Sequence, residues 1–229
     1  MRRGGRTVKN ASTFRRWTPT AVAALVLTGA IVSASMVLTT RTRESDSSWP
    51  LSVAVIGDAF TAGESNGVVW PTLLAQRTGW SVSNFAMPGA GFAADGRGGH
   101  AFTHQVERAQ AARPRIILIT TGQADNDLPE MGAVTVGAID AFHKIQLGGQ
   151  RALVIGPMWY GDPAPGKVQM VSEAVREAAR ITDVPFLSGI EPPWLNRSLM
   201  QGNLHSPNDA GHSVIADRVA AWLRTEVGG

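Results

Sequence analysis

The sequence predicts an α/β fold with three layers, in which a five-stranded parallel sheet lies between two layers of helices. Two observations lead to this prediction. Short apolar runs alternate along the chain with amphipathic segments of helical length, a pattern that builds parallel sheets covered on both faces. Glycine and polar residues directly follow several of the apolar runs, as they do at the carboxyl edge of such sheets, where ligands bind.

Each strand is read from an apolar or β-branched run. The clearest is 115–121 (RIILITT), and the first, 52–56, ends directly before Gly57. Pro185 cannot donate a ladder hydrogen bond, so we expect the last strand at an edge of the sheet. The five predicted strands are residues 52–56, 80–86, 115–121, 151–155 and 184–187.

The helices are read from apolar residues that recur with the helical period. Pro71 falls in the first turn of one of them, where proline is tolerated. Ser206, Pro207 and Asp209 read as the N-cap, the first and the third residue of the closing helix. The five predicted helices are residues 68–77, 102–112, 134–147, 168–181 and 207–226.

The N-terminal region reads as a membrane-directing segment. Residues 1–16 form a basic tail that we expect in the cytoplasm, and residues 17–40 carry no charge. Roughly 20 apolar residues span a bilayer, and positive charge in front favours a cytoplasmic N-terminus. Two interpretations stay open, an uncleaved anchor in the cell membrane or a signal peptide removed from a secreted protein. Both export the domain of residues 51–229, which follows a polar linker, 41–50.

The charge distribution argues against a nucleic-acid partner. The chain has a net charge of +3, but six of its 21 basic residues precede residue 17, where there is no acidic residue. The other 15 basic residues lie in the rest of the chain together with all 18 acidic residues, so acidic residues outnumber basic ones there. We therefore expect the membrane to be a partner through the N-terminal segment, and nucleic acid not to be one.

Cysteine is absent from the chain, which excludes disulfides and metal–thiolate sites. We expect neither a metal nor a cofactor.

Four short motifs stand where a sheet would bring them to one edge. The first three follow the first three predicted strands, and the fourth leads into the closing helix. They are residues 57–63 (GDAFTAG), 84–91 (NFAMPGAG), 121–128 (TGQADNDL) and 202–212 (GNLHSPNDAGH).

This series resembles the SGNH (GDSL-type) hydrolases, whose blocks read Gly-Asp-Ser-x-x-x-Gly, Gly-x-Asn-Asp and Asp-x-x-His, the last commonly continued Pro-Asn-x-x-Gly-His. The resemblance implies a flavodoxin-like three-layer fold. It also implies an esterase or lipase that attacks acyl or acetyl esters with a serine, a histidine base and an orienting aspartate.

Carried over residue by residue, the resemblance assigns His205 to the position of the catalytic base. It assigns Gly89 to the oxyanion hole and also places Asp58 at this ligand-binding site. The third block has two alignments. A strict match from Gly122 puts Ala124 at the oxyanion asparagine, whereas two extra residues put Asn126 there, and we prefer the second.

Two positions of the triad lack the required side chain, because Ala59 stands at the nucleophile and Gly202 at the aspartate. One hypothesis is a silent domain that binds an ester or carbohydrate ligand, or a partner protein, at the cell envelope, with residues 159–166 as a specificity loop. The alternative is an active esterase whose nucleophile is unidentified, with Thr61 and Ser65 as candidates, or a chain mutated at position 59.

Overall fold

The structure is a computed structural model that describes residues 50–95 and 101–228. The chain divides between Trp49 and Pro50, and only the part after this division is described. The predicted cytoplasmic tail, the predicted anchor or signal segment and all but the last residue of the predicted linker lie outside the described residues. None of the described helices is long and apolar enough to cross a membrane.

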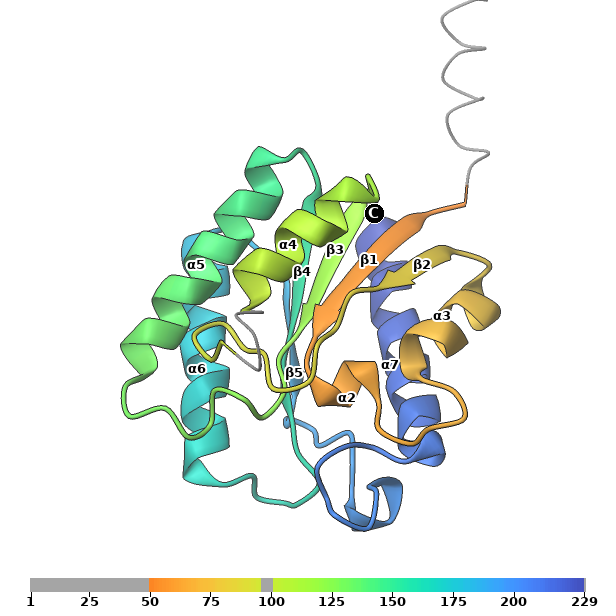
Figure 1. The fold of residues 1–229 in the computed structure, drawn as a ribbon, viewed down its shortest axis with the longest axis vertical. Helices are drawn as coiled ribbons and strands as arrows, with labels where there is room; N and C mark the ends of the chain where they lie inside the picture. Colours follow the sequence, from red (N-terminus) through yellow and green to blue (C-terminus); the bar gives the residue numbers. More distant parts are fainter. Residues whose placement is uncertain (1–49, 96–100, 229) are drawn as a thin grey trace, which may run out of the picture. The chain divides into compact units, whose positions relative to one another are not determined.

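Five parallel strands form the sheet in the spatial order β2-β1-β3-β4-β5 (Figure 1). Each strand pairs in parallel register with its neighbours. The α/β fold with a five-stranded parallel sheet is thus confirmed, and β5 lies at an edge, as Pro185 indicated. The strands are β1 (Ser52–Gly57), β2 (Ser81–Asn84), β3 (Ile116–Thr120), β4 (Arg151–Met158) and β5 (Phe186–Gly189).

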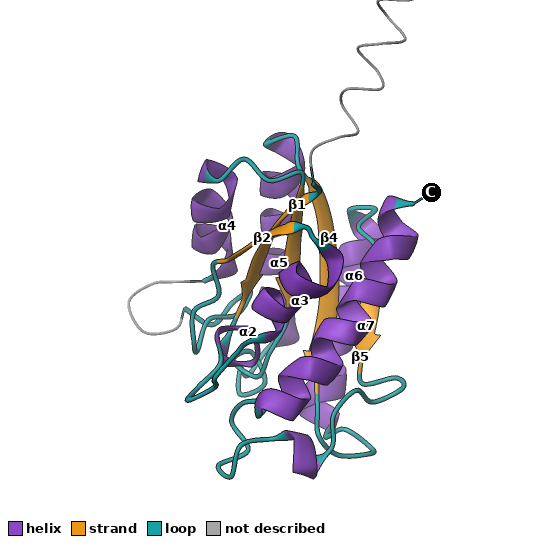
Figure 2. Ribbon diagram, turned by 90° about the vertical axis from the view of Figure 1, so that its right-hand side faces the viewer, coloured by secondary structure: helices purple, strands orange, loops and turns teal. Residues whose placement is uncertain are grey.

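Helices cover both faces of the sheet, α3 and α7 on one side and α4, α5 and α6 on the other (Figures 1 and 2). The helices are α2 (Ala59–Ala62), α3 (Trp70–Thr78), α4 (Phe102–Ala111), α5 (Met131–Leu147), α6 (Gly166–Ile181) and α7 (Asp209–Val227), with a 3-10 turn, η1 (Arg197–Leu199).

Alternation along the strands produces two cores. In β1, Ala54 and Ile56 pack among residues of α4, α5 and α6, whereas Val53 and Val55 pack with α3 and α7. Successive side chains of a strand point to opposite faces, so an uninterrupted apolar run fills both sides of a covered sheet. The strand tips are thereby fixed between two buried layers.

The structure corrects the start of the closing helix. Asn208 is the N-cap of α7, and its side chain accepts the backbone N–H of Gly211 at 3.0 Å. The prediction of Ser206 as the N-cap was wrong, because the asparagine two residues later provides the capping oxygen. Ser206 lies before the helix and is fully buried.

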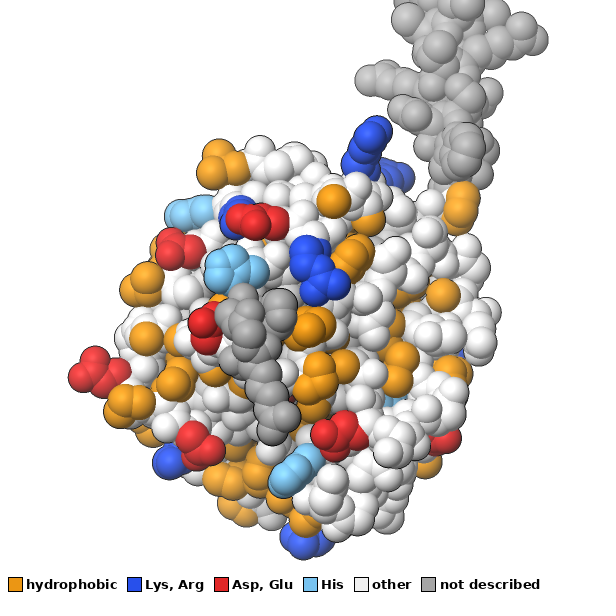
Figure 3. All heavy atoms as spheres, in the orientation of Figure 1, with side chains coloured by type: hydrophobic (Ala, Val, Ile, Leu, Met, Phe, Trp, Pro, Cys, Tyr) orange, Lys and Arg blue, Asp and Glu red, His pale blue; other side chains and the backbone are white. Residues whose placement is uncertain are grey.

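Charged side chains of both signs are scattered over the face seen in Figure 3, without a continuous basic patch on that face. The sequence-based prediction that nucleic acid is not a partner stays a prediction.

Candidate functional site

The tip of β1 is organised by Asp58, which is 3% exposed. Its carboxylate accepts the backbone N–H of Phe60 at 2.9 Å and so caps α2. It also accepts the N–H of Gln123, beyond the tip of β3, at 2.9 Å. Burial raises the pKa of Asp58 to about 6, although both N–H donors act in the opposite direction. Asp58 therefore joins two loops, and its carboxylate is occupied by backbone donors.

Ala59 begins α2 directly after Asp58 and is partly exposed. Its backbone N–H makes no hydrogen bond to the described part of the chain, and the same holds for Gly89, in the loop after β2. Gly89 has a φ of +78°, which glycine adopts without strain. Free backbone N–H groups of this kind can bind a carbonyl oxygen or an anion.

The Thr61 hydroxyl is not placed as a substitute for a serine, whereas Ser65 stays a candidate. Thr61 is fully buried, and its Oγ1 lies 2.5 Å from Oγ1 of Thr120. Ser65 is exposed and stands beyond the end of α2. A nucleophile must be reachable by substrate and by a base. Because Thr61 is buried, neither can reach its hydroxyl.

Asp125 holds the loop after β2 against the loop after β3. Its buried carboxylate accepts the N–H groups of Phe92, Ala93 and Ala94 at 2.8, 3.1 and 2.8 Å. Sequence reasoning missed this residue. The available signal was the strict alignment from Gly122, which puts Asp125 at the aspartate of Gly-x-Asn-Asp.

Asn126, the residue preferred from the sequence, and its neighbour Asp127 have different surroundings. Asn126 is 9% exposed and its Oδ1 is buried without a hydrogen-bond partner among the described residues. The side chain of Asp127 is 93% exposed and pairs with Lys167 at 3.3 Å. The role of Asn126 in an oxyanion hole stays a prediction.

Hydrogen bonds connect the loop after α2 to the segment before α7 and to the first residue of α7. Gln201 Nε2 donates to the carbonyl of Glu64 at 3.1 Å, and Asn66 Nδ2 donates to the Asp209 carboxylate at 2.9 Å. The first and last motifs are therefore neighbours, although they are far apart in the sequence. Within residues 50–95 and 101–228, no group of three acidic or histidine side chains could hold a metal ion.

Comparison with known proteins identifies the family of this chain. The sequence model of the GDSL-like lipase/acylhydrolase family matches residues 55–214. The chain belongs to this family. It is similar to the GDSL lipase Rv0518 of Mycobacterium tuberculosis, with 26% identity over 192 residues, which are 77% of this chain and 83% of the relative.

Solved structures of GDSL-type proteins and esterases share the fold. The esterase EstA of a Pseudoalteromonas species aligns with a TM-score of 0.61 and 16% identity, covering 77% of this chain and 98% of EstA. The acetyl xylan esterase AlAXEase aligns with a TM-score of 0.60 and 13% identity, covering 75% and 99%. At these identities the likeness establishes the fold alone.

The last GDSL motif has two possible registers in this chain. His205 is exposed, and its side chain makes no hydrogen bond to the described residues, while its backbone N–H donates to Asn203 Oδ1 at 3.0 Å. Ser206 stands directly before Pro207-Asn208, where the family histidine precedes Pro-Asn. In that register, Asn203 rather than Gly202 takes the aspartate position. Gly202 has open space around its Cβ position.

His212 is part of the framework of the fold. It is fully buried, and its Nδ1 accepts the backbone N–H of Trp70 at 3.2 Å, which joins α7 to α3. Burial lowers the pKa of His212 to about 4, against the attraction of Asp209, so the ring is neutral at pH 7.

Proposed function

We infer that this protein is an exported, non-hydrolytic member of the GDSL family that binds an ester-bearing ligand at the cell envelope. The observation that carries this proposal is Ala59, which stands where the family has its serine and has a methyl side chain that no base can activate. In a subtilisin-type triad, loss of the nucleophile costs about 10⁶ in kcat.

The other catalytic positions support the same conclusion. If His205 is read as the base, the aspartate position holds Gly202. If Ser206 is read at the base position, the aspartate position holds Asn203. Neither register provides a complete pair of base and orienting carboxylate.

Binding remains feasible because the framework of the site is retained. The N–H groups of Ala59 and Gly89 have no partner in the described chain, and the Asn126 amide lies in the neighbouring loop. Such donors suit a carbonyl or a carboxylate. The fold is shared with proteins named esterase and acetyl xylan esterase, so acyl esters and esterified carbohydrates are the ligand classes to test.

The basic tail and the uncharged segment 17–40 support export and attachment to the membrane. Protease treatment of intact cells tests this part, because an exported domain is digested from outside and a cytoplasmic one is protected.

Hydrolysis of p-nitrophenyl acetate by the full chain tests the loss of catalysis. Two variants restore the triad in the two registers, Ala59→Ser/Gly202→Asp and Ala59→Ser/Asn203→Asp/Ser206→His. We expect no turnover above buffer for the natural chain and measurable turnover for one of the variants. Robust, equal rates in all three proteins would show an active esterase with a different nucleophile.

A further inference from the structure

A polar hollow lies beside the end of α2. It has a volume of about 390 Å³ and is lined by Glu64, Ser65, Gln201, Gly202 and Asn203. Among the described residues, no apolar side chain takes part in this lining. Glu64 directly follows Gly63, the C-cap of α2, so the hollow opens one short helix away from Ala59.

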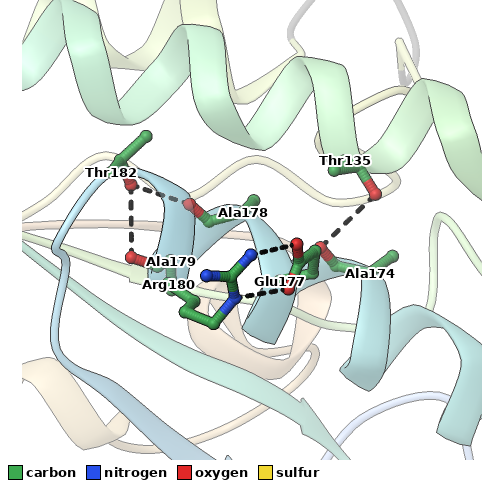
Figure 4. A network of polar contacts seen from close by, with 7 residues as sticks. All are labelled: Thr135, Ala174, Glu177, Ala178, Ala179, Arg180 and Thr182. Carbon is green, nitrogen blue, oxygen red and sulfur yellow. Dashed lines mark hydrogen bonds and ion pairs between the residues drawn. The ribbon is translucent and has the colours of Figure 1, made fainter.

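A larger, apolar groove of about 660 Å³ lies elsewhere, between α5 and α6 on the other face of the sheet. Met131, Met170 and Ala174 line it, and Figure 4 shows the Thr135 hydroxyl pointing to the Ala174 carbonyl, 3.4 Å away. Apolar ligand groups require an apolar lining. The hollow beside the site provides carboxylate, hydroxyl and amide groups instead, which suit a ligand rich in hydroxyls.

An aromatic stack stands at the same edge of the sheet. Trp159 and Tyr160 directly follow β4, and their rings are stacked with centroids 4.4 Å apart and planes 23° apart. Tyr160 packs against the core under α7, and the Arg197 guanidinium lies 5.6 Å from the centre of its ring. Tyr160 is thereby held in place from the protein side.

Trp159 is the outer member of this stack. It is partly exposed and is not among the described residues that pack in or against either core. Its indole N–H makes no hydrogen bond to the described residues. A fixed aromatic ring with a free N–H offers both a flat apolar surface and a polar contact.

The stack and the hollow are connected through one short stretch of chain. Arg197 contacts Tyr160, while Gln201 and Asn203 line the hollow. We propose that this edge binds a saccharide, with a sugar ring stacked on Trp159 and hydroxyl groups bound in the hollow of residues 64–65 and 201–203. The proposal rests on the ligand-binding function and names the ligand class as carbohydrate ester rather than lipid.

Isothermal titration calorimetry of the full chain with acetylated xylotetraose tests the proposal, with octanoate as the lipid-like probe. Trp159→Ala should weaken saccharide binding about three- to tenfold, the range of an aromatic contact. Trp159→Phe should restore most of it. Trp80→Ala is the matched control, because Trp80 comes directly before β2, at the opposite end of the strands, and should change nothing.

The outcomes separate this inference from the proposed function. Octanoate binding that Ala59→Leu weakens, without saccharide binding, would overturn the inference and leave a ligand-binding domain. Saccharide binding that Trp159→Ala leaves unchanged would also overturn the inference. Binding of neither probe would overturn the inference, because the acetylated saccharide represents the ligand class that it names. Thermal melts of Trp159→Phe and Trp159→Ala distinguish a lost contact from a lost fold.

Discussion

The Asp58 carboxylate accepts the Gln123 N–H at 2.9 Å across the tips of β1 and β3. This contact leaves no room for a side chain at Gly122, where a Cβ atom would lie 1.8 Å from Asp58 Oδ2. The two loops that carry Ala59 and Asn126 are therefore fixed to each other by a buried carboxylate in contact with a glycine.

Gly122→Ala should destabilise the protein by about 1–3 kcal/mol or more, because the new methyl group forces Asp58 out of its bonds. Chemical denaturation measures the change. Gly132→Ala is the control, since Gly132 lies in α5 with nothing within 4 Å of its Cβ position. There alanine should raise stability by up to about 1 kcal/mol. Equal effects at both positions would contradict the close approach at Gly122.

Asp125→Asn should cost several times more stability than Asp127→Asn. The buried Asp125 carboxylate serves three backbone donors, and an amide group would turn N–H groups toward some of them. Each buried donor left without an acceptor costs about 1–3 kcal/mol. Among the described residues, the Asp127 carboxylate has an exposed ion pair alone, which contributes less than about 1 kcal/mol. Urea midpoints of the two variants measure the difference, and similar midpoints would refute the role of Asp125.

Asp58 and His212 should make opposite contributions to the dependence of stability on pH. The folded pKa of Asp58, about 6, exceeds its ordinary value of 3.8, so its contribution falls as pH rises through that interval. The folded pKa of His212, about 4, is below 6.5, so its contribution falls as pH drops from 6.5 to 4. The two slopes oppose each other, and the natural chain should have a shallow profile between pH 4 and 6.

Single variants should show the separate contribution of each group to the dependence of the free energy of unfolding on pH. His212→Asn keeps an acceptor near the position of Nδ1 and removes the titration, so the free energy of unfolding should rise as pH falls from about 6 to 4. Asp58→Asn should give the reverse, a decline on acidification. Urea unfolding at several pH values measures both. Parallel profiles for the two variants would mean that one of these groups does not titrate as its burial implies.

The strands and helices were predictable because burial imposes a period on the sequence. The run from Ile116 to Thr120 is buried along its whole length, and a short β-branched run of this kind is typical of a strand covered on both faces. Helix α2 was missed because four residues are too short for a periodic pattern. The start of α7 was misplaced because Ser206 and Asn208 are both good capping residues, and only the chain path decides between them.

The framework of the site was harder to predict than its location. The placement of motifs after strands indicated which edge would carry the site. The role of Asp125 depends on the backbone amides of residues 92–94, which lie more than thirty positions earlier in the chain. A local sequence pattern cannot predict a contact over that distance. The register of the last motif is ambiguous for a related reason, because one extra residue separates His205 from Pro207.

The alignment of the last motif can be tested by replacing His205 in the two variants that restore a triad. Ser206 is fully buried and its Oγ lies 3.5 Å from the carboxylate of Glu64, a residue that lines the polar hollow. We expect Ala59→Ser/Asn203→Asp/Ser206→His to hydrolyse p-nitrophenyl acetate, and the added change His205→Ala to leave its kcat nearly unchanged.

The same added change in Ala59→Ser/Gly202→Asp should abolish any turnover of that variant, because His205 is its only base in this register. A result in which only the Gly202 variant is active, and loses activity with His205→Ala, would assign the base position to His205. The kcat values of the four proteins thus decide which residue faces position 59, since a base must lie within hydrogen-bond reach of the hydroxyl it activates.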